Sequence, residues 1–219
     1  MISAVMFDMD GVLVDSEPAH FAVTVDALAA QGLPVPDDHD WERVFLGRPD
    51  VDGFAEWFLE HRISVDLDVL MADKLGRFMT RFAELVTPFN DGQWLARALF
   101  KRGVRLALVT GARRAEADMI LRSSRLSDAF EATISADDVT RGKPDPEPYL
   151  MGAAALGVSA RDCLVIEDAV VGLRAAEAAG ASVIVVDRLH RPERFVSTQP
   201  VTRLDAAVLR DILARRQPD

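Results

Sequence analysis

The feature that most constrains the fold is a series of short, almost uninterrupted apolar segments that alternate with helical patterns from about residue 93 onward. These apolar segments are residues 104–109, 132–135, 163–166 and 182–186. Strands that are apolar along their whole length are typical of a parallel sheet covered by helices, because both of their faces are buried. A further apolar run at residues 4–7 is too short to stand alone, so we expect it to join the same sheet.

Residues 16–84 show a different pattern, with helical periodicity and almost no strand-like segment. Phe21, Val25 and Leu28, for example, recur at the three- and four-residue intervals of an amphipathic helix. The sequence therefore predicts an α/β fold with a doubly wound, Rossmann-like parallel sheet. This core is expected at residues 1–15 and 85–219, and an α-helical domain at 16–84 is inserted after its first strand.

The overall charge narrows the class of partners. The 219 residues include 25 Lys and Arg and 35 Asp and Glu, which gives a formal net charge of −10 at pH 7. So acidic a chain repels nucleic acid and anionic membranes, and we expect neither as a partner. It also repels phosphorylated metabolites, so any phosphate site in it has to be locally cationic.

Cysteine content and hydropathy bear on the compartment. Cys163 is the single cysteine, which excludes an internal disulfide, and its apolar neighbours predict a core position. No apolar run approaches the roughly 20 residues that a membrane-spanning helix needs. The first residues also lack the basic and long apolar regions of a signal peptide. We therefore expect a cytoplasmic protein that does not bind membranes.

Acidic and polar residues follow several of the predicted strands directly. They are Asp8 and Asp10 after the first strand, Thr110 after the second, and Glu167 with Asp168 after the fourth. Ligands of a doubly wound sheet bind beyond the carboxyl ends of the strands, so these residues are expected to converge. Four carboxylates at one site repel one another unless a counter-charge is present. Mg²⁺, a hard cation with oxygen ligands, supplies that charge.

Lys143 is the second source of positive charge at this edge. It lies in Gly142-Lys143-Pro144, between the third strand and its helix. Together Mg²⁺ and Lys143 would supply the local positive charge that a phosphate site needs in a protein of net charge −10. The sequence has no His or Cys cluster of the kind that binds zinc.

Four motifs resemble those of the haloacid dehalogenase superfamily. In chain order they are Asp8-Met9-Asp10-Gly11, Thr110 after an apolar strand, Gly142-Lys143-Pro144, and Glu167-Asp168. The helical insertion lies where this family places its cap domain, and the arrangement is similar to the β-phosphoglucomutase-like branch. The resemblance implies a magnesium-dependent phosphatase that hydrolyses a small phosphorylated metabolite, such as a sugar phosphate, through an aspartyl-phosphate intermediate.

The resemblance also implies roles for the core residues. Asp8 would be the nucleophile, and Asp10 the general acid and base. Thr110 and Gly111 would bind the phosphoryl oxygens, and Lys143 would neutralise their charge. In this chain Thr110 is followed by Gly111 and Ala112, whereas the family often has two small hydroxyl residues here.

The metal ligands implied by the resemblance are Asp8, Asp168 and Asp10, the last through its backbone carbonyl. Glu167 would hold a metal-bound water. Three residues of the inserted domain lie near positions where β-phosphoglucomutase-like proteins contact substrate. These three are His20, Arg48 and Lys74, and each is equally expected as an ordinary surface residue.

The sequence is also compatible with other functions. A sugar phosphomutase would share the same core site and return the phosphoryl group to a second hydroxyl. Dehalogenation is disfavoured by Asp10, and phosphonate hydrolysis would need a Schiff-base lysine in the cap. A receiver-like signalling module is disfavoured by the large insertion. The sequence leaves the oligomeric state open and is compatible with a monomer.

Overall fold

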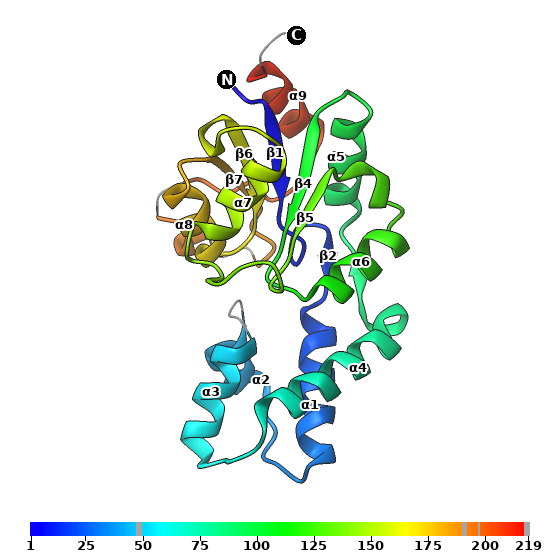
Figure 1. Ribbon diagram of the computed structural model, residues 1–219, viewed down its shortest axis with the longest axis vertical. Coiled ribbons are helices and arrows are strands. Elements are labelled where there is room, and N and C mark those ends of the chain that lie inside the picture. The colour runs from blue at the N-terminus through cyan, green and yellow to red at the C-terminus, as the bar shows by residue number, and fades with distance from the viewer. Residues whose placement is uncertain (47–49, 190–191, 197, 217–219) are drawn as a thin grey trace. The chain divides into compact units, whose positions relative to one another are not determined.

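The computed structural model describes residues 1–46, 50–189, 192–196 and 198–216 (Figure 1). The chain divides into two compact units. The α/β unit comprises Met1–Asp15 and Pro88–Asp219, and the helical unit comprises Ser16–Thr87. None of the helices in the described ranges combines the length and the apolar character that crossing a membrane requires.

The α/β unit is built on a five-stranded sheet in the order β5-β4-β1-β6-β7, with all strands parallel. The strands are β1 (Ala4–Phe7), β4 (Arg105–Val109), β5 (Ala132–Ile134), β6 (Cys163–Glu167) and β7 (Ser182–Val185). In the central strand, Phe7 lies opposite Leu108 on one side and Ile166 on the other. All four residues of β1 are buried, which explains why this segment contains no polar residue. The predicted parallel α/β core is thus confirmed.

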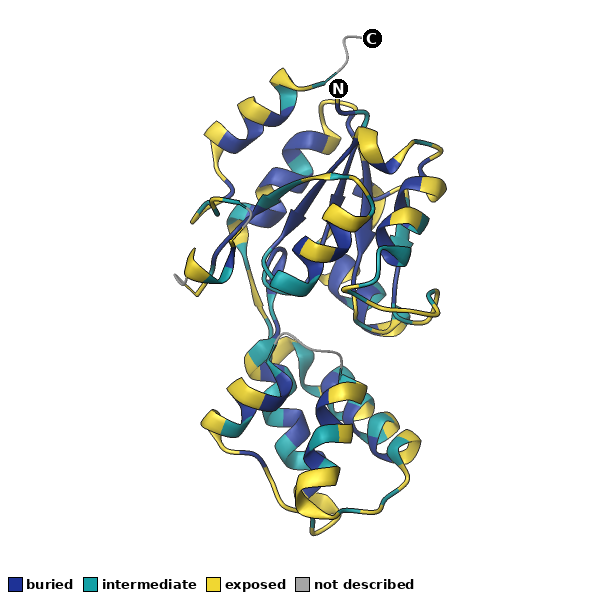
Figure 2. Cartoon of the chain, turned by 90° about the vertical axis from the view of Figure 1, so that its left-hand side faces the viewer, coloured by how far each residue is buried: buried dark blue, intermediate teal, exposed yellow. Residues whose placement is uncertain are grey.

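Helices cover both faces of this sheet. The helices are α5 (Asn90–Phe100), α6 (Arg114–Ser123), α7 (Glu147–Ala155), α8 (Val170–Ala178) and α9 (Ala206–Ala214). On one face α7 packs against β1, β4 and β5, and α8 packs against β6 and β7. On the other face α5 packs against β4 and α9 (Figure 1). The interior under α7 includes Tyr149, Ala153, Met6 and Val109, all buried. Figure 2 shows the buried strands between the two helical layers.

Local signals set two of the helix ends. The side chain of Asp205 accepts hydrogen bonds from the first backbone N–H groups of α9, at Ala207 (2.8 Å) and Val208 (3.3 Å). This bonding satisfies donors that a helix start leaves unpaired. Gly180 follows α8 with a φ of +84°, the left-handed conformation that favours glycine after a helix. Cys163 is buried in β6, as its apolar neighbours predict.

The helical unit contains α1 (Glu17–Ala30), α2 (Asp38–Asp40), a π-helical turn (Trp41–Phe45), α3 (Asp50–His61) and α4 (Leu67–Leu85). Its interior is aromatic. Phe45 stacks on Trp41 with 4.9 Å between ring centroids and meets Phe54 edge-on at 5.3 Å. Such contacts stabilise a small core beyond the area they bury. Two short strands, β2 (Val14–Asp15) and β3 (Thr87–Pro88), pair with each other.

Candidate active site

The loop after β1 carries the two aspartates of the first motif. Asp8 is 7% exposed, and its N–H donates to the carbonyl of Ile166 at 2.9 Å. Gly11 has a φ of +75°, and a Cβ built on it would lie 1.9 Å from Asp168 Oδ2. Glycine is therefore required at this position both for the turn and for the approach of Asp168. The first and fourth motifs are in direct contact through this residue.

Lys143 is the residue on which the motifs converge. Its Nζ donates to Asp8 Oδ1 at 2.7 Å, to Glu167 Oε1 at 2.7 Å and to the carbonyl of Val109 at 3.2 Å. Burial alone would lower the lysine pKa, but the carboxylates of Asp8 and Glu167 raise it well above its usual value. The ammonium is therefore charged throughout the physiological range. Residues 135 positions apart in sequence, Asp8 and Lys143, are brought together as predicted.

Glu167 uses both carboxylate oxygens within the protein. Oε1 accepts from Lys143 and from the Tyr149 hydroxyl, each at 2.7 Å. Oε2 accepts from the backbone N–H groups of Asp168 (2.9 Å) and Ala169 (3.0 Å). These four hydrogen bonds occupy the roughly four acceptor sites of a carboxylate. Glu167 is therefore bonded as an internal counter-charge that fixes the side chain of Lys143.

The acids at this site are costly to keep ionised without a cation. Burial raises the pKa of Asp8 to about 7; Lys143 opposes the shift, and Glu167 and Asp10 add to it. Burial and the neighbouring carboxylates likewise raise the pKa of Asp168 well above its usual value. Ligand oxygens of Asp8, Glu167 and Asp168 lie within 4.8 Å of one another. Asp8 and the partly buried Asp168 offer hard carboxylate oxygens that need positive charge, and these donors fit Mg²⁺.

Thr110 lies at the carboxyl end of β4, beside this cluster in the sheet order. It is 3% exposed, and its N–H donates to the carbonyl of Ile134 at 2.9 Å. Its hydroxyl oxygen accepts from the N–H of Ala112 at 3.1 Å, just before α6 begins. Gly111, which lies between them, is exposed. The hydroxyl thus organises the turn that places backbone N–H groups at this edge of the sheet.

Two of the three residues predicted to contact substrate from the inserted domain have structural partners inside the helical unit. His20 stacks on Phe78 with 4.7 Å between ring centroids. Lys74 is 3% exposed and forms an ion pair with Asp50. Arg48 lies outside the described residues. A role of His20 or Lys74 toward substrate therefore stays a prediction.

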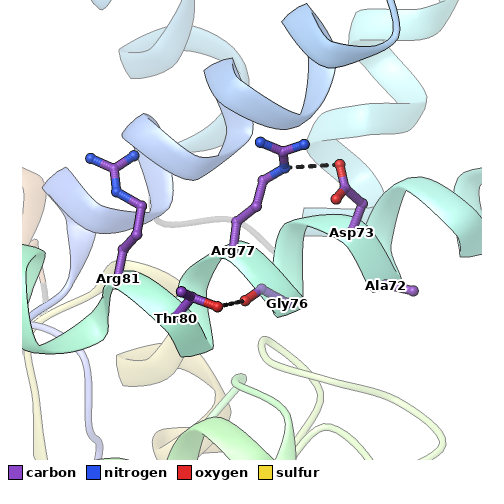
Figure 3. Close-up of a pocket in the computed structure, with 6 residues that line it drawn as sticks. All are labelled: Ala72, Asp73, Gly76, Arg77, Thr80 and Arg81. Atoms are coloured by element: carbon purple, nitrogen blue, oxygen red, sulfur yellow. Dashed lines mark hydrogen bonds and ion pairs between the residues drawn. The ribbon is translucent and has the colours of Figure 1, made fainter.

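One face of α4 in the helical unit forms a hollow of about 380 Å³. It is lined by Ala72, Asp73, Gly76, Arg77, Thr80 and Arg81 (Figure 3). Arg77 donates to Asp73 at 2.9 Å, and Arg81 donates to Asp26 of α1 at 2.5 Å. Both guanidinium groups thus already hold carboxylate partners, and neither was singled out by the sequence.

Sequence reasoning missed two further side chains of the α/β unit. The Tyr149 hydroxyl bonds Glu167, although the sequence showed only that a tyrosine follows the third motif. Arg188 donates from Nε to the carbonyl of Gly11 at 3.0 Å. Nothing in the sequence near Arg188 indicates this contact, because the two residues are 177 positions apart.

The fold and site together define the class of protein. Acidic side chains meet one lysine at the carboxyl ends of the parallel strands, which is where proteins with such a sheet bind ligands. The fold and the site are therefore those of an enzyme that uses its own carboxylates in catalysis. More particularly, residues 2–180 match the haloacid dehalogenase-like hydrolases, and the chain belongs to that family. The resemblance seen in the four sequence motifs is thereby confirmed.

Known proteins similar to this chain include a phosphorylated carbohydrates phosphatase of Thermotoga maritima. It is 33% identical over 189 residues, which cover 82% of each protein. The chloroplastic protein SUPPRESSOR OF QUENCHING 1 of Arabidopsis thaliana is 34% identical over 84% of this chain, which spans only 18% of that relative. Among solved structures, CbbY of Rhodobacter sphaeroides in complex with phosphate aligns with a TM-score of 0.83. That alignment covers 93% of this chain and 95% of CbbY at 24% identity, which supports the fold.

Proposed function

We propose that this hydrolase is a magnesium-dependent phosphatase that acts on a small phosphomonoester, such as a sugar phosphate, through an aspartyl-phosphate on Asp8. The observation that carries the proposal is the buried contact of Lys143 with Asp8 and Glu167, each at 2.7 Å. The similarity to a phosphorylated carbohydrates phosphatase supports the substrate class. In this account the local cationic site overcomes the net charge of −10.

The first chemical step is assigned to Asp8. Lys143 holds one of its carboxylate oxygens, and the other attacks phosphorus in line with the leaving oxygen. The new P–O bond forms as the bond to the leaving group breaks, and Asp10 gives its proton to the departing alkoxide. Lys143 offsets the negative charge on the phosphoryl oxygens during this transfer.

The second step releases phosphate. Asp10, now ionised, takes a proton from water as the water oxygen attacks the phosphorus of the aspartyl-phosphate. The P–O bond to Asp8 breaks, which restores its carboxylate and frees inorganic phosphate. Thr110 and the N–H groups beside it are assigned to the phosphoryl oxygens in both steps.

Asp8, Asp168 and the backbone carbonyl of Asp10 are the residues that would hold Mg²⁺. The ion supplies positive charge that allows the clustered acids to be ionised together and shields the substrate phosphate. For Glu167, predicted to hold a metal-bound water, we propose instead a role toward Lys143, because its four hydrogen bonds occupy both carboxylate oxygens. We also propose that the helical unit acts as the family's cap and selects the leaving group.

The test is phosphate release from a panel of sugar phosphates and other small phosphomonoesters, with Mg²⁺ or with EDTA. We expect release that depends on Mg²⁺ and disappears in Asp8→Asn. The matched control is Asp128→Asn, an exposed aspartate of the same unit, which should keep wild-type turnover. Activity retained by Asp8→Asn would refute the mechanism. Isomerisation of a hexose phosphate that outruns phosphate release would identify a phosphomutase instead.

A further inference from the structure

Arg188 joins the loop that follows β1 (residues 8–13, the catalytic loop) to the start of α5. The residue follows β7, and its side chain is 15% exposed. Its Nε donates to the carbonyl of Gly11 at 3.0 Å. The two Nη atoms donate to the two carboxylate oxygens of Asp91, at 2.9 and 3.0 Å. The guanidinium also lies over the ring of Phe89, 4.2 Å from its centroid. Paired donors of this kind fix a guanidinium in one orientation.

Asp91 is itself fixed by the backbone. Its Oδ1 accepts from the N–H of Gly92 at 2.9 Å, and its Oδ2 accepts from the N–H of Leu204 at 3.0 Å. Although burial alone would raise it, the pKa of Asp91 is lowered by these bonds and by Arg188. The ion pair is therefore maintained at neutral pH, and Arg188 is anchored at its far end.

The segment from Phe89 to Gln93 also contacts the catalytic loop, at the carbonyls of Val12 and Leu13. The N–H of Phe89 donates to the Leu13 carbonyl at 3.0 Å, and Gln93 Nε2 donates to the same oxygen at 3.2 Å. A Cβ on Gly92 would lie 1.9 Å from the Val12 carbonyl oxygen, so the two backbones are in close contact. Leu13 and Val12 are thus held by backbone packing that does not require Arg188. At Gly11 the N–H donates to the Val14 carbonyl at 2.8 Å, whereas the carbonyl is bonded by the arginine.

We propose that Arg188 is a positioning residue for proton transfer, because it fixes the Gly11 carbonyl and with it the direction in which Asp10 presents its carboxyl group. This inference rests on the proposed function, in which Asp10 protonates the leaving oxygen. The Gly11 carbonyl lies in the peptide that follows Gly11, so its displacement reaches the Asp10–Gly11 peptide, and with it the acid, through the two backbone torsions of Gly11. A displacement of about 1 Å at a reacting group costs on the order of 100-fold in rate.

The experiment compares two substrates in Arg188→Met and in Arg188→Lys. One is an alkyl phosphate, whose leaving alkoxide needs the proton of Asp10, and the other is p-nitrophenyl phosphate, whose leaving group departs without one. The measured quantity is kcat/KM, which reports the steps up to the departure of the leaving group. Asp10→Asn provides the reference for complete loss of the acid.

Arg105→Met is the matched control. Arg105 also donates to both carboxylate oxygens of one acid, Glu131, and to a backbone carbonyl, that of Leu156. It is the first residue of β4, at the end of the strand opposite to the candidate site. Loss of its contacts affects stability alone, and kcat/KM for both substrates should stay at the wild-type value.

We expect Arg188→Met to lower kcat/KM for the alkyl phosphate about 10- to 100-fold more than for p-nitrophenyl phosphate. Arg188→Lys, which keeps the charge and loses the paired geometry, should show the same preference to a smaller degree. Equal losses on both substrates, or no loss in either folded variant, would overturn the inference. A wild-type protein that releases no phosphate from either substrate would refute the proposed function itself.

Discussion

Removing one hydroxyl tests how the site is held together. Tyr149 is the single tyrosine of the chain and is fully buried, and its hydroxyl donates to Glu167 Oε1 at 2.7 Å. Tyr149→Phe keeps the ring and deletes only this donor. Because a hydrogen bond to a charged group contributes about 1.5–3 kcal/mol, the free energy of unfolding of the α/β unit should fall by that amount. The midpoint of thermal unfolding should fall by about 3–12 °C.

Thr24 provides the opposite case within the same chain. Its hydroxyl is buried in α1, and no group in the described part of the chain hydrogen-bonds to it. Thr24→Val replaces that hydroxyl with a methyl group of similar size. A buried polar group without a partner costs about 1–3 kcal/mol, so we expect this variant to be at least as stable as the wild type.

Calorimetry and urea unfolding of both variants and the wild type measure these effects. The two substitutions lie in different units. If the units unfold in separate transitions, the transition that a variant shifts belongs to the unit that contains its substitution. Turnover of Tyr149→Phe should also fall, since Glu167 Oε1 holds both Tyr149 and Lys143. A Tyr149→Phe variant within about 0.5 kcal/mol of the wild type would refute the reasoning. So would a loss of equal size in both variants.

Two further predictions concern the acids and their cation. Burial raises the pKa of Asp8 to about 7, above the value of 3.8 that the group has in the unfolded chain. The buried, protonated carboxyl group therefore contributes its full stabilisation of the folded protein below pH 3.8, and this stabilisation is lost as the pH rises through 7. In metal-free protein the melting temperature of Asp8→Asn relative to wild type should therefore rise over this range, and a constant difference would contradict the assignment. Gly11→Ala should abolish Mg²⁺ binding measured by titration calorimetry, because its Cβ would lie 1.9 Å from Asp168 Oδ2. Gly103→Ala is the control, because Gly103 has a similar φ of +69° but no atom lies within 4 Å of an added Cβ. This variant should bind Mg²⁺ like the wild type. Equal binding by both variants would show that the close approach of Asp168 to Gly11 is unimportant.

The sheet and the convergence of the motifs could be predicted from the sequence for one physical reason. A parallel strand buried on both faces has to be apolar throughout, and its carboxyl end fixes where the next residues lie. Asp8, Lys143 and Glu167 are therefore predicted to lie at one edge of the sheet. Their contacts in the structure agree with that placement.

The contacts between side chains that depend on packing could not be predicted from the sequence. The hydrogen bonds of Glu167 with Lys143 and Tyr149, and the ion pair of Arg188 with Asp91, join residues 18 to 97 positions apart in the chain, and no periodicity encodes them. The same limit applies to the helical unit, where a histidine or lysine on an amphipathic helix has the same pattern whether it faces a ligand or its own core. His20 stacks on Phe78 and Lys74 pairs with Asp50, and the sequence pattern predicts neither contact.

The central claim is that Asp8 forms a covalent bond to phosphorus, and one measurement addresses it directly. The enzyme is mixed with Mg²⁺ and its best substrate from the panel, quenched in acid within the first turnover, digested and analysed by mass spectrometry. The account predicts a peptide that carries one additional phosphoryl group on Asp8, formed in Asp128→Asn and absent from Asp8→Asn. A wild-type enzyme that turns over substrate while Asp8 stays unmodified at every quench time would contradict it.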